Sequence, residues 1–426
     1  MHLKNKKAFI AISFFILTGI VFRLIWIEDM EWKGDEQTMF KVAQEAVETG
    51  KWPLIGLVGS AGIPHPGMHI WVFSVIALLA HDPISMTRIV QFLNIFTIAG
   101  FCLFTVSRIE NDQKEIWLWG IALASVSPLA VLFSRKLWVP DILPFFSLLV
   151  IIGHAYRRRG YGAFFWGFSG AIIGQVHMSG FSYALALVIS TLLYERINRK
   201  DSVTKWGYWF AGSVIGSIGL IPWVIHLWVG SYSSSFKLLH VIANIILFPL
   251  LWSADALGIG LQYSMHSSFW SFLKGPYING IPTFGIAVLH FILVAIGLFS
   301  FKLLTAEIKL WISRIKSGDA FKGLSLLDFY LYSFFFIMGL FTIFGGVVIY
   351  AHHLIIIFPF IYLSVVKILY PRKKLILTMI MSQLLITFFF LNYVHKHEGV
   401  LDGDYGKSYK AQMVAKEHIL PDRDAK

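Results

Sequence analysis

Acidic residues stand out in this sequence because its long apolar runs contain almost none. Asp35 and Glu36 open a segment in which Phe40, Ala43 and Val47 recur at helical spacing. This pattern places Asp35 at or just before a helix N-terminus. A carboxylate held there can accept a proton as a general base, or it can simply cap the helix.

Two other short segments hold polar residues of the same kind. Asp141 closes the sequence Ser-Arg-Lys-Leu-Trp-Val-Pro-Asp, which also contains Arg135 and Lys136. His65 stands between Pro64 and Pro66, and the two prolines stiffen its backbone. Each has a structural alternative: a helix cap for Asp141, interfacial anchors for the two cations, and a helix-start turn for His65.

Further polar residues lie at the ends of apolar runs. They are cations or hydrogen-bonding side chains, which can bind an anion such as a phosphate. The alternatives are a snorkelling arginine and an interfacial cap formed by the adjacent histidines. These residues are Arg88, His177, Tyr350, His352 and His353.

The composition predicts a membrane protein. Of 426 residues, 57% are apolar and 14% are charged, against about 45–50% and 25% in soluble domains. This balance excludes a soluble globular enzyme, a disordered protein and a nucleic-acid-binding module. The net charge of +12 comes from short clusters between apolar runs, as is typical of membrane-flanking cations. Cys102 is the single cysteine, so no intrachain disulfide can form and no cysteine-based metal site is expected.

The apolar runs predict an all-α polytopic protein with about 11 transmembrane helices. The first run follows a basic N-terminus without a cleavage site, so we expect an uncleaved signal anchor. Placing the basic clusters in the cytoplasm puts the N-terminus inside and the C-terminus outside, with 66–80 juxtamembrane. It is ambiguous from the sequence alone whether 66–80 and 238–261 span the membrane. The predicted spans are 8–27, 88–107, 116–133, 142–156, 162–177, 180–195, 206–228, 282–303, 325–346, 350–369 and 375–392.

This topology divides the chain into membrane modules and outer segments. The predicted parts are the signal anchor 1–27, an outer loop 28–87 with juxtamembrane helices, a module 88–228 containing the outer turn 134–141, an outer segment 229–281, C-terminal helices 282–392 and an outer tail 393–426.

In order, these motifs resemble the superfamily of protein mannosyltransferases and aminoarabinose transferases, which are integral-membrane glycosyltransferases of the GT-C architecture. The resemblance covers about 30–180: a first membrane helix, the acidic pair, Gly-Lys-Trp-Pro, the His-Pro turn and the Arg135-to-Asp141 segment. Beyond it, Gly174 to His177, Tyr350 to Pro359 and Gly403 to Gly406 resemble later motifs, the last of them in bacterial members. One departure is His65-Pro66-Gly67, where the family has a second proline.

The resemblance implies a GT-C-type helical bundle in the plasma (inner) membrane, with its active site on the outer face. It implies inverting transfer of a sugar from a polyprenyl-phosphate donor to a glycan, lipid or protein acceptor. Membrane lipid is the other expected partner, because the protein lies in the bilayer. Asp35 is then the expected base, with Glu36 and Asp141 as further catalytic candidates. The donor phosphate would be bound by residues among His65, Arg88, Arg135, Lys136, His177, Tyr350, His352 and His353.

Other interpretations stay open at this point. Some members of the wider group use Mg²⁺ or Mn²⁺ and nearer ones do not, so a divalent metal is left undecided. A multispan transporter or flippase of a lipid-linked or small solute is the main alternative function, although such proteins usually carry a functional polar residue at mid-depth. A non-catalytic membrane scaffold is the third hypothesis.

Overall fold

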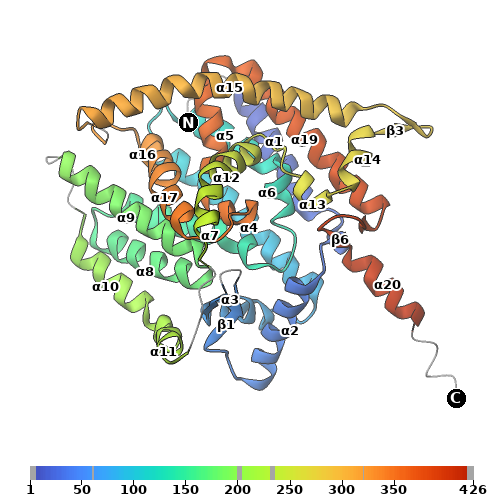
Figure 1. The fold of residues 1–426 in the computed structure, drawn as a ribbon, viewed down its shortest axis with the longest axis horizontal. Coiled ribbons are helices and arrows are strands. Elements are labelled where there is room, and N and C mark those ends of the chain that lie inside the picture. Colours follow the sequence, from blue (N-terminus) through green and yellow to red (C-terminus); the bar gives the residue numbers. More distant parts are fainter. Residues whose placement is uncertain (1–5, 60–61, 199–203, 231–235, 320, 420–426) are drawn as a thin grey trace.

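The computed structural model describes residues 6–59, 62–198, 204–230, 236–319 and 321–419 (Figure 1). Across these ranges the chain is helical almost throughout, and the strands form three two-stranded antiparallel pairs. The predicted all-α class is therefore confirmed.

The N-terminal half carries the first loop between two long helices. Its elements are α1 (Lys6–Leu24), η1 (Ile27–Asp29), α2 (Gly34–Thr49), β1 (Ile55–Val58), β2 (Pro64–Pro66), α3 (Met68–Ala77), α4 (Pro83–Arg108), α5 (Lys114–Val126), α6 (Pro128–Leu132), α7 (Val139–Ala155), α8 (Gly160–Val176) and α9 (Ser179–Ile197).

The C-terminal half ends in a short hairpin and a last helix. Its elements are α10 (Trp206–Gly216), η2 (Ile218–Leu220), α11 (Ile221–Val229), α12 (Leu238–Ala256), α13 (Gln262–Met265), α14 (Ser268–Lys274), β3 (Tyr277–Ile278), β4 (Ile281–Pro282), α15 (Gly285–Lys316), α16 (Leu326–Tyr332), the π-helical η3 (Ser333–Met338), α17 (Gly339–Phe344), η4 (Ala351–Ile357), α18 (Phe360–Leu369), η5 (Tyr370–Arg372), α19 (Lys373–Lys396), β5 (Gly399–Val400), β6 (Gly406–Lys407) and α20 (Tyr409–Ile419).

Seven helical stretches among the described residues are long and apolar enough to cross a membrane, against the 11 spans predicted. They include 238–256, which the sequence left ambiguous. The other ambiguous segment forms α3, whose ten residues measure about 15 Å, half the hydrocarbon thickness, so its length fits the juxtamembrane prediction. The seven stretches are Lys6–Leu24, Pro83–Arg108, Trp206–Val229, Leu238–Ala256, Gly285–Thr305, Leu326–Phe344 and Phe360–Lys396.

Four of the remaining predicted spans are helical but do not meet this measure, and the last two correspond to a single stretch. The stretch 116–133 is split into α5 and α6, because Pro128 follows Ser127 and cannot continue the helix. The stretches 142–156, 162–177 and 180–195 form α7, α8 and α9. The stretches 350–369 and 375–392 fall within η4, α18 and α19, of which Phe360–Lys396 forms one of the seven.

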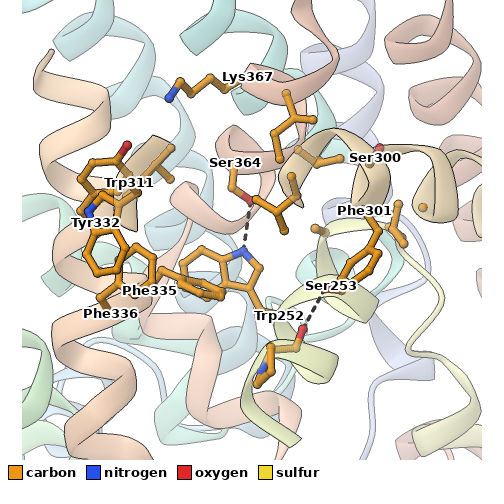
Figure 2. Close-up of a pocket in the computed structure, with 18 residues that line it drawn as sticks. Trp252, Ser253, Ser300, Phe301, Trp311, Tyr332, Phe335, Phe336, Ser364 and Lys367 are labelled. Atoms are coloured by element: carbon orange, nitrogen blue, oxygen red, sulfur yellow. Dashed lines mark hydrogen bonds between the residues drawn. The ribbon is translucent and has the colours of Figure 1, made fainter. Parts of the chain in front are cut away.

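Helix α15, with 32 residues, runs along one side of the molecule (Figure 1). Between it and α12, η3 and α18 lies an apolar cavity of about 250 Å³ (Figure 2).

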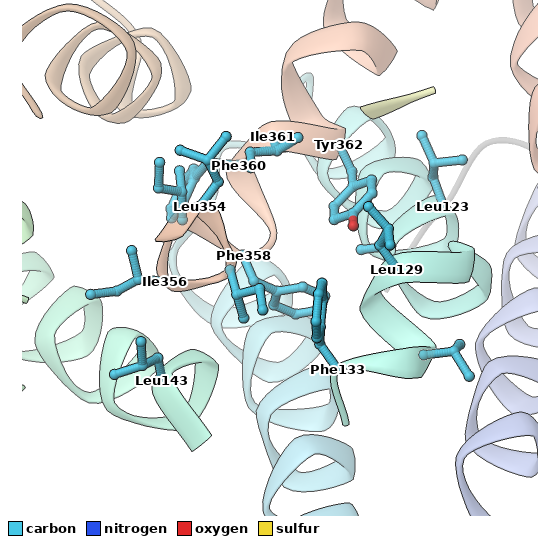
Figure 3. Packing of buried hydrophobic residues seen from close by; sticks show 14 of the residues in the cluster. Leu123, Leu129, Phe133, Leu143, Leu354, Ile356, Phe358, Phe360, Ile361 and Tyr362 are labelled. Atoms are coloured by element: carbon cyan, nitrogen blue, oxygen red, sulfur yellow. The ribbon is translucent and has the colours of Figure 1, made fainter. Parts of the chain in front are cut away.

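The core surrounds α5, α7 and the η4–α18 segment, whose apolar side chains pack together in Figure 3. A charged residue, Arg23, is buried in it. Its guanidinium donates to the carbonyl oxygens of Gly19, Ser125 and Ala130 at 2.9, 2.6 and 3.3 Å. The break at Pro128 leaves helix-end carbonyls unpaired, and Arg23 supplies donors there. This arrangement fixes the end of α1 against the α5–α6 break.

Candidate functional site

The first loop presents its two acidic residues in different ways. Lys33 occupies the N-cap position of α2, and Asp35 is the second residue of the helix, exposed at its N-terminus. Glu36 is fully buried, and its Oε2 accepts the Lys33 N–H at 3.2 Å, so this side chain caps the helix. Only Asp35 of the pair faces open space.

The second half of the loop folds back as a hairpin. Strands β1 and β2 pair antiparallel, and β2 consists of the buried residues Pro64, His65 and Pro66. The His65 ring stacks on His69 of α3, with ring centroids 4.1 Å apart and planes 7° apart. The stiff His65 segment thus belongs to an ordered pair of imidazoles.

These residues meet others from distant parts of the chain in one cavity of about 480 Å³. His177 lies 5.3 Å from His65 and 6.2 Å from His353, measured between ring centroids. Five of the predicted site residues line the cavity. Its walls include Asp35, Met39, Leu57, His65, His69, Trp138, His177, Ser179, Ser182, Phe341, Ile349, His352 and His353.

Hydrogen bonds assign the ring protons of three of these histidines in their neutral forms. The Nδ1 of His177 accepts the Ser179 N–H at 3.3 Å, and the Nδ1 of His353 accepts the Tyr350 N–H at 3.1 Å. Both rings therefore carry their proton on Nε2. His69 is the opposite case, because its Nδ1 lies 3.0 Å from the Val176 carbonyl oxygen and must donate to it, so its Nε2 is an acceptor. The cavity wall thus carries two imidazole donors and one imidazole acceptor.

The histidines of the first loop are neutral at physiological pH. Burial, together with the neighbouring rings of His69 and His353, lowers the pKa of His65 to about 3. Burial also lowers the pKa of His69 to about 4, against the opposing effects of the Val176 carbonyl and Asp35. These side chains therefore act through hydrogen bonds, and a positive charge on them would be costly.

A buried ion cluster lies outside the cavity wall. The Lys136 Nζ lies 2.8 Å from Glu31 Oε2 and 3.3 Å from Glu36 Oε1. Burial opposes the charge on Lys136, but these two carboxylates outweigh it and raise the pKa of Lys136. Burial likewise raises the pKa of Glu36 to about 7, with Lys136 opposing the shift. Lys136 also lies 4.1 Å from the centroid of the Trp138 ring, which belongs to the cavity wall.

Asp141 is fully buried in the first turn of α7. Neither carboxylate oxygen has a hydrogen-bond partner, and the residue is absent from the cavity lining, although Val139 and Pro140 belong to it. Its main-chain oxygen accepts a bond from Asn94 at 2.8 Å. Glu36 and Asp141 therefore stand behind the wall that Asp35 faces.

The two predicted phosphate-binding arginines contact main-chain carbonyls instead of the cavity. Arg135 donates to the carbonyl oxygens of Phe22 and Trp26, and Arg88 donates to that of Leu24 at 2.8 Å. These oxygens are at the end of α1, where helical carbonyls have no intrahelical partner. A basic residue near a helix C-terminus is favourable there, which explains why the sequence places both arginines nearby.

The tail holds the chain just before Asp35. Lys33 pairs with Asp404 at 2.9 Å, the Tyr409 N–H donates to the Met30 carbonyl at 3.0 Å, and Gln412 donates to the Trp32 carbonyl at 2.5 Å. Tyr350, also predicted as a site residue, is partly exposed and contributes its N–H to His353 without lining the cavity.

Of the residues in this region that were not predicted from the sequence, three bear on its chemistry. His69 and Trp138 line the cavity, and Glu31 joins the ion cluster behind it. The one signal for His69 was its place four residues after His65, although His65 lies in β2 and only His69 lies on α3. Glu31 gave no such signal, because its partner Lys136 is 105 positions away.

Metal binding was left open by the sequence. Among the described residues, no group of three or more histidine, cysteine or acidic side chains is arranged to hold a metal ion. Comparisons with protein-family models and with curated protein sequences give no match.

Proposed function

We propose that this protein is a membrane glycosyltransferase that uses a polyprenyl-phosphate-linked sugar as donor. The observation that carries the proposal is the single cavity lined by an exposed carboxylate, Asp35, and five histidines. A base beside several hydrogen-bond donors is what displacement of a phosphate by a hydroxyl or amine requires. The cavity is also large enough for a small organic group.

The proposed reaction is an inverting displacement. Asp35 takes the proton from the acceptor hydroxyl or amine as the new bond to the sugar's anomeric carbon forms. The bond from that carbon to the phosphate oxygen breaks, and its electron pair leaves with the polyprenyl phosphate. The acceptor is a glycan, lipid or protein on the same side of the membrane.

The phosphate would be bound by neutral histidines. His177 and His353 carry protons on Nε2 and can donate to phosphate oxygens as negative charge develops during bond breaking. His65 and His352 line the same cavity and are the next candidates. In this proposal Arg88, Arg135, Lys136, Glu36 and Asp141 shape and support the site without contacting the donor.

The proposal includes a placement in the cell. We infer a GT-C-type bundle of about 11 membrane helices in the inner membrane, with the N-terminus cytoplasmic and the cavity on the outer face. Seven stretches that can span by length and apolarity support a polytopic membrane protein. The basic clusters between the apolar runs support the orientation.

Release of polyprenyl phosphate tests the function. The full-length protein would be reconstituted with its native membrane lipids, supplied with a glycan and protein extract of the same cells as acceptor, and incubated with a panel of polyprenyl-phosphate-linked hexoses and pentoses. We expect one donor to be consumed, with free polyprenyl phosphate appearing by chromatography. Asp35→Asn should lower this rate by roughly 10²- to 10⁴-fold, the usual contribution of a general base.

Glu45→Gln is the matched control, because Glu45 is an exposed acid on the same helix. It should react at the wild-type rate. Undiminished turnover in folded Asp35→Asn would remove Asp35 as the base. Movement of a lipid-linked sugar across liposomes without phosphate release would favour the transporter hypothesis instead.

A further inference from the structure

We propose that the apolar cavity between α12, α15, η3 and α18 binds one anionic phospholipid of the bilayer, with a hydrocarbon chain inside and the phosphate near Lys367. This site is separate from the histidine cavity, with which it shares no lining residue. The proposal does not depend on the glycosyltransferase function.

The lining of the cavity suits a hydrocarbon chain. Its walls are mainly apolar, with Trp252 and Phe301 among the labelled side chains of Figure 2. The three serines on the wall use their hydroxyl protons internally. Ser253 donates to Pro249, Ser300 donates to Ile296 and Ser364 donates to Ile361. A dry apolar cavity of this kind takes up apolar groups in preference to water.

The cavity is elongated along α15. It contacts this helix from Gly297 to Trp311, a distance of about 21 Å at the helical rise per residue. A space that follows a helix over this length can hold an extended hydrocarbon chain.

One side of the cavity carries a polar atom, Trp311 Nε1, that lacks a hydrogen-bond partner among the described residues. The buried Trp311 Nε1 has no hydrogen-bond acceptor, although its ring stacks on Phe336 with centroids 3.6 Å apart. In Figure 2, Lys367 extends its amine toward the side on which Trp311 and Tyr332 lie, away from Phe301. An ester or phosphate oxygen of a lipid would supply the acceptor that Trp311 lacks.

Charge selects the class of lipid. Lys367 is the one cation among the described residues that line the cavity, and it forms an ion pair with Asp328, which does not line it. Its ammonium has three N–H donors, so those not directed at Asp328 can bind a lipid phosphate. A lipid with a net negative charge is favoured beside this cation over a zwitterionic lipid.

Native mass spectrometry of the full-length protein in detergent tests the site. The probes are phosphatidylglycerol and phosphatidylcholine with identical dioleoyl chains. We expect one phosphatidylglycerol to bind at about fivefold lower concentration than phosphatidylcholine, the effect of one nearby cation. Ser253→Phe places an aromatic ring in the cavity and should weaken binding of both lipids about tenfold.

Two further variants complete the test. Lys367→Gln should abolish the preference for phosphatidylglycerol, and Lys367→Arg should retain it. Leu298→Phe is the control for added bulk, because Leu298 is exposed on α15 beside the cavity without lining it. Equal binding of the two lipids by the wild type, or lipid binding by Ser253→Phe that matches Leu298→Phe, would overturn the proposal.

Discussion

Asp35 and Glu36 are adjacent in sequence, but Asp35 is exposed and Glu36 is buried. We therefore propose a catalytic role for Asp35 and a stabilising role for Glu36. Asp35 is exposed at the cavity, whereas Glu36 caps α2 and faces Lys136. We expect Glu36→Ala to lower the free energy of unfolding by about 1–3 kcal/mol, because it removes a cap and a partner of a buried cation. Thermal unfolding in detergent measures this. Glu45→Ala is the control, and equal melting temperatures for the two variants would contradict the assignment.

His65 predicts a defined pH dependence of stability. Its pKa in the fold is about 3, against an ordinary value of 6.5, so between these values the unfolded chain binds more protons than the folded one. The contribution of His65 is therefore complete above pH 6.5 and is lost as the pH falls toward 3. The slope for one such residue reaches about 1.4 kcal/mol per pH unit.

The variant His65→Asn should accordingly lose less stability than the wild type between pH 6.5 and 4.5. Unfolding temperatures followed by tryptophan fluorescence across this range give the comparison. His81→Asn, at an exposed position, should follow the wild-type curve. Parallel curves for His65→Asn and the wild type would show that His65 is not held neutral by burial.

At the scale of elements, local sequence signals predicted where the helices lie better than they predicted which groups the side chains contact. Apolar runs located α1, α4 and α15, and the pattern after Asp35 located α2. The partners of the two arginines could not be predicted in this way, because a guanidinium can donate hydrogen bonds to a phosphate or to a helix-end carbonyl. Only the fold shows that Arg88 and Arg135 reach carbonyls at the end of α1. The histidine cavity depends on segments that the sequence separates by more than a hundred residues.

The contact between α8 and α10 depends on glycine. A Cβ at Gly212 would lie 2.0 Å from the Phe164 carbonyl oxygen, so the helices approach too closely for any side chain there. We expect Gly212→Ala to lower the free energy of unfolding by about 1–3 kcal/mol, as overpacking does. Gly207→Ala, on the same helix with nothing within 4 Å, should be neutral or slightly stabilising. Thermal unfolding of both variants tests this prediction. Equal stability of Gly212→Ala and Gly207→Ala would show that α8 and α10 can move apart without a loss of free energy of unfolding.

At the scale of the whole molecule, the first loop and the C-terminal tail pack together beside the candidate base. The tail contacts residues 30–33 through Asp404, Tyr409 and Gln412, which precede or belong to α20. Because Asp35 follows this segment directly, we infer that the tail limits the motion of the α2 N-terminus.

Amide hydrogen exchange of the full chain tests this coupling. In the double variant Asp404→Ala/Gln412→Ala, exchange in a peptide covering 29–37 should become roughly five- to tenfold faster, the effect of losing about one hydrogen bond's stabilisation. Lys407→Ala, at an exposed position in the same tail, should leave that peptide unchanged. Peptides from α8 report global stability, because they do not contact the tail. Unchanged exchange at 29–37 in the double variant would mean that the remaining contacts of the first loop hold it without these two side chains; they include Lys136 with Glu31 and the Tyr409 N–H with Met30. Faster exchange in α8 as well would mean that the tail stabilises the whole bundle rather than the site.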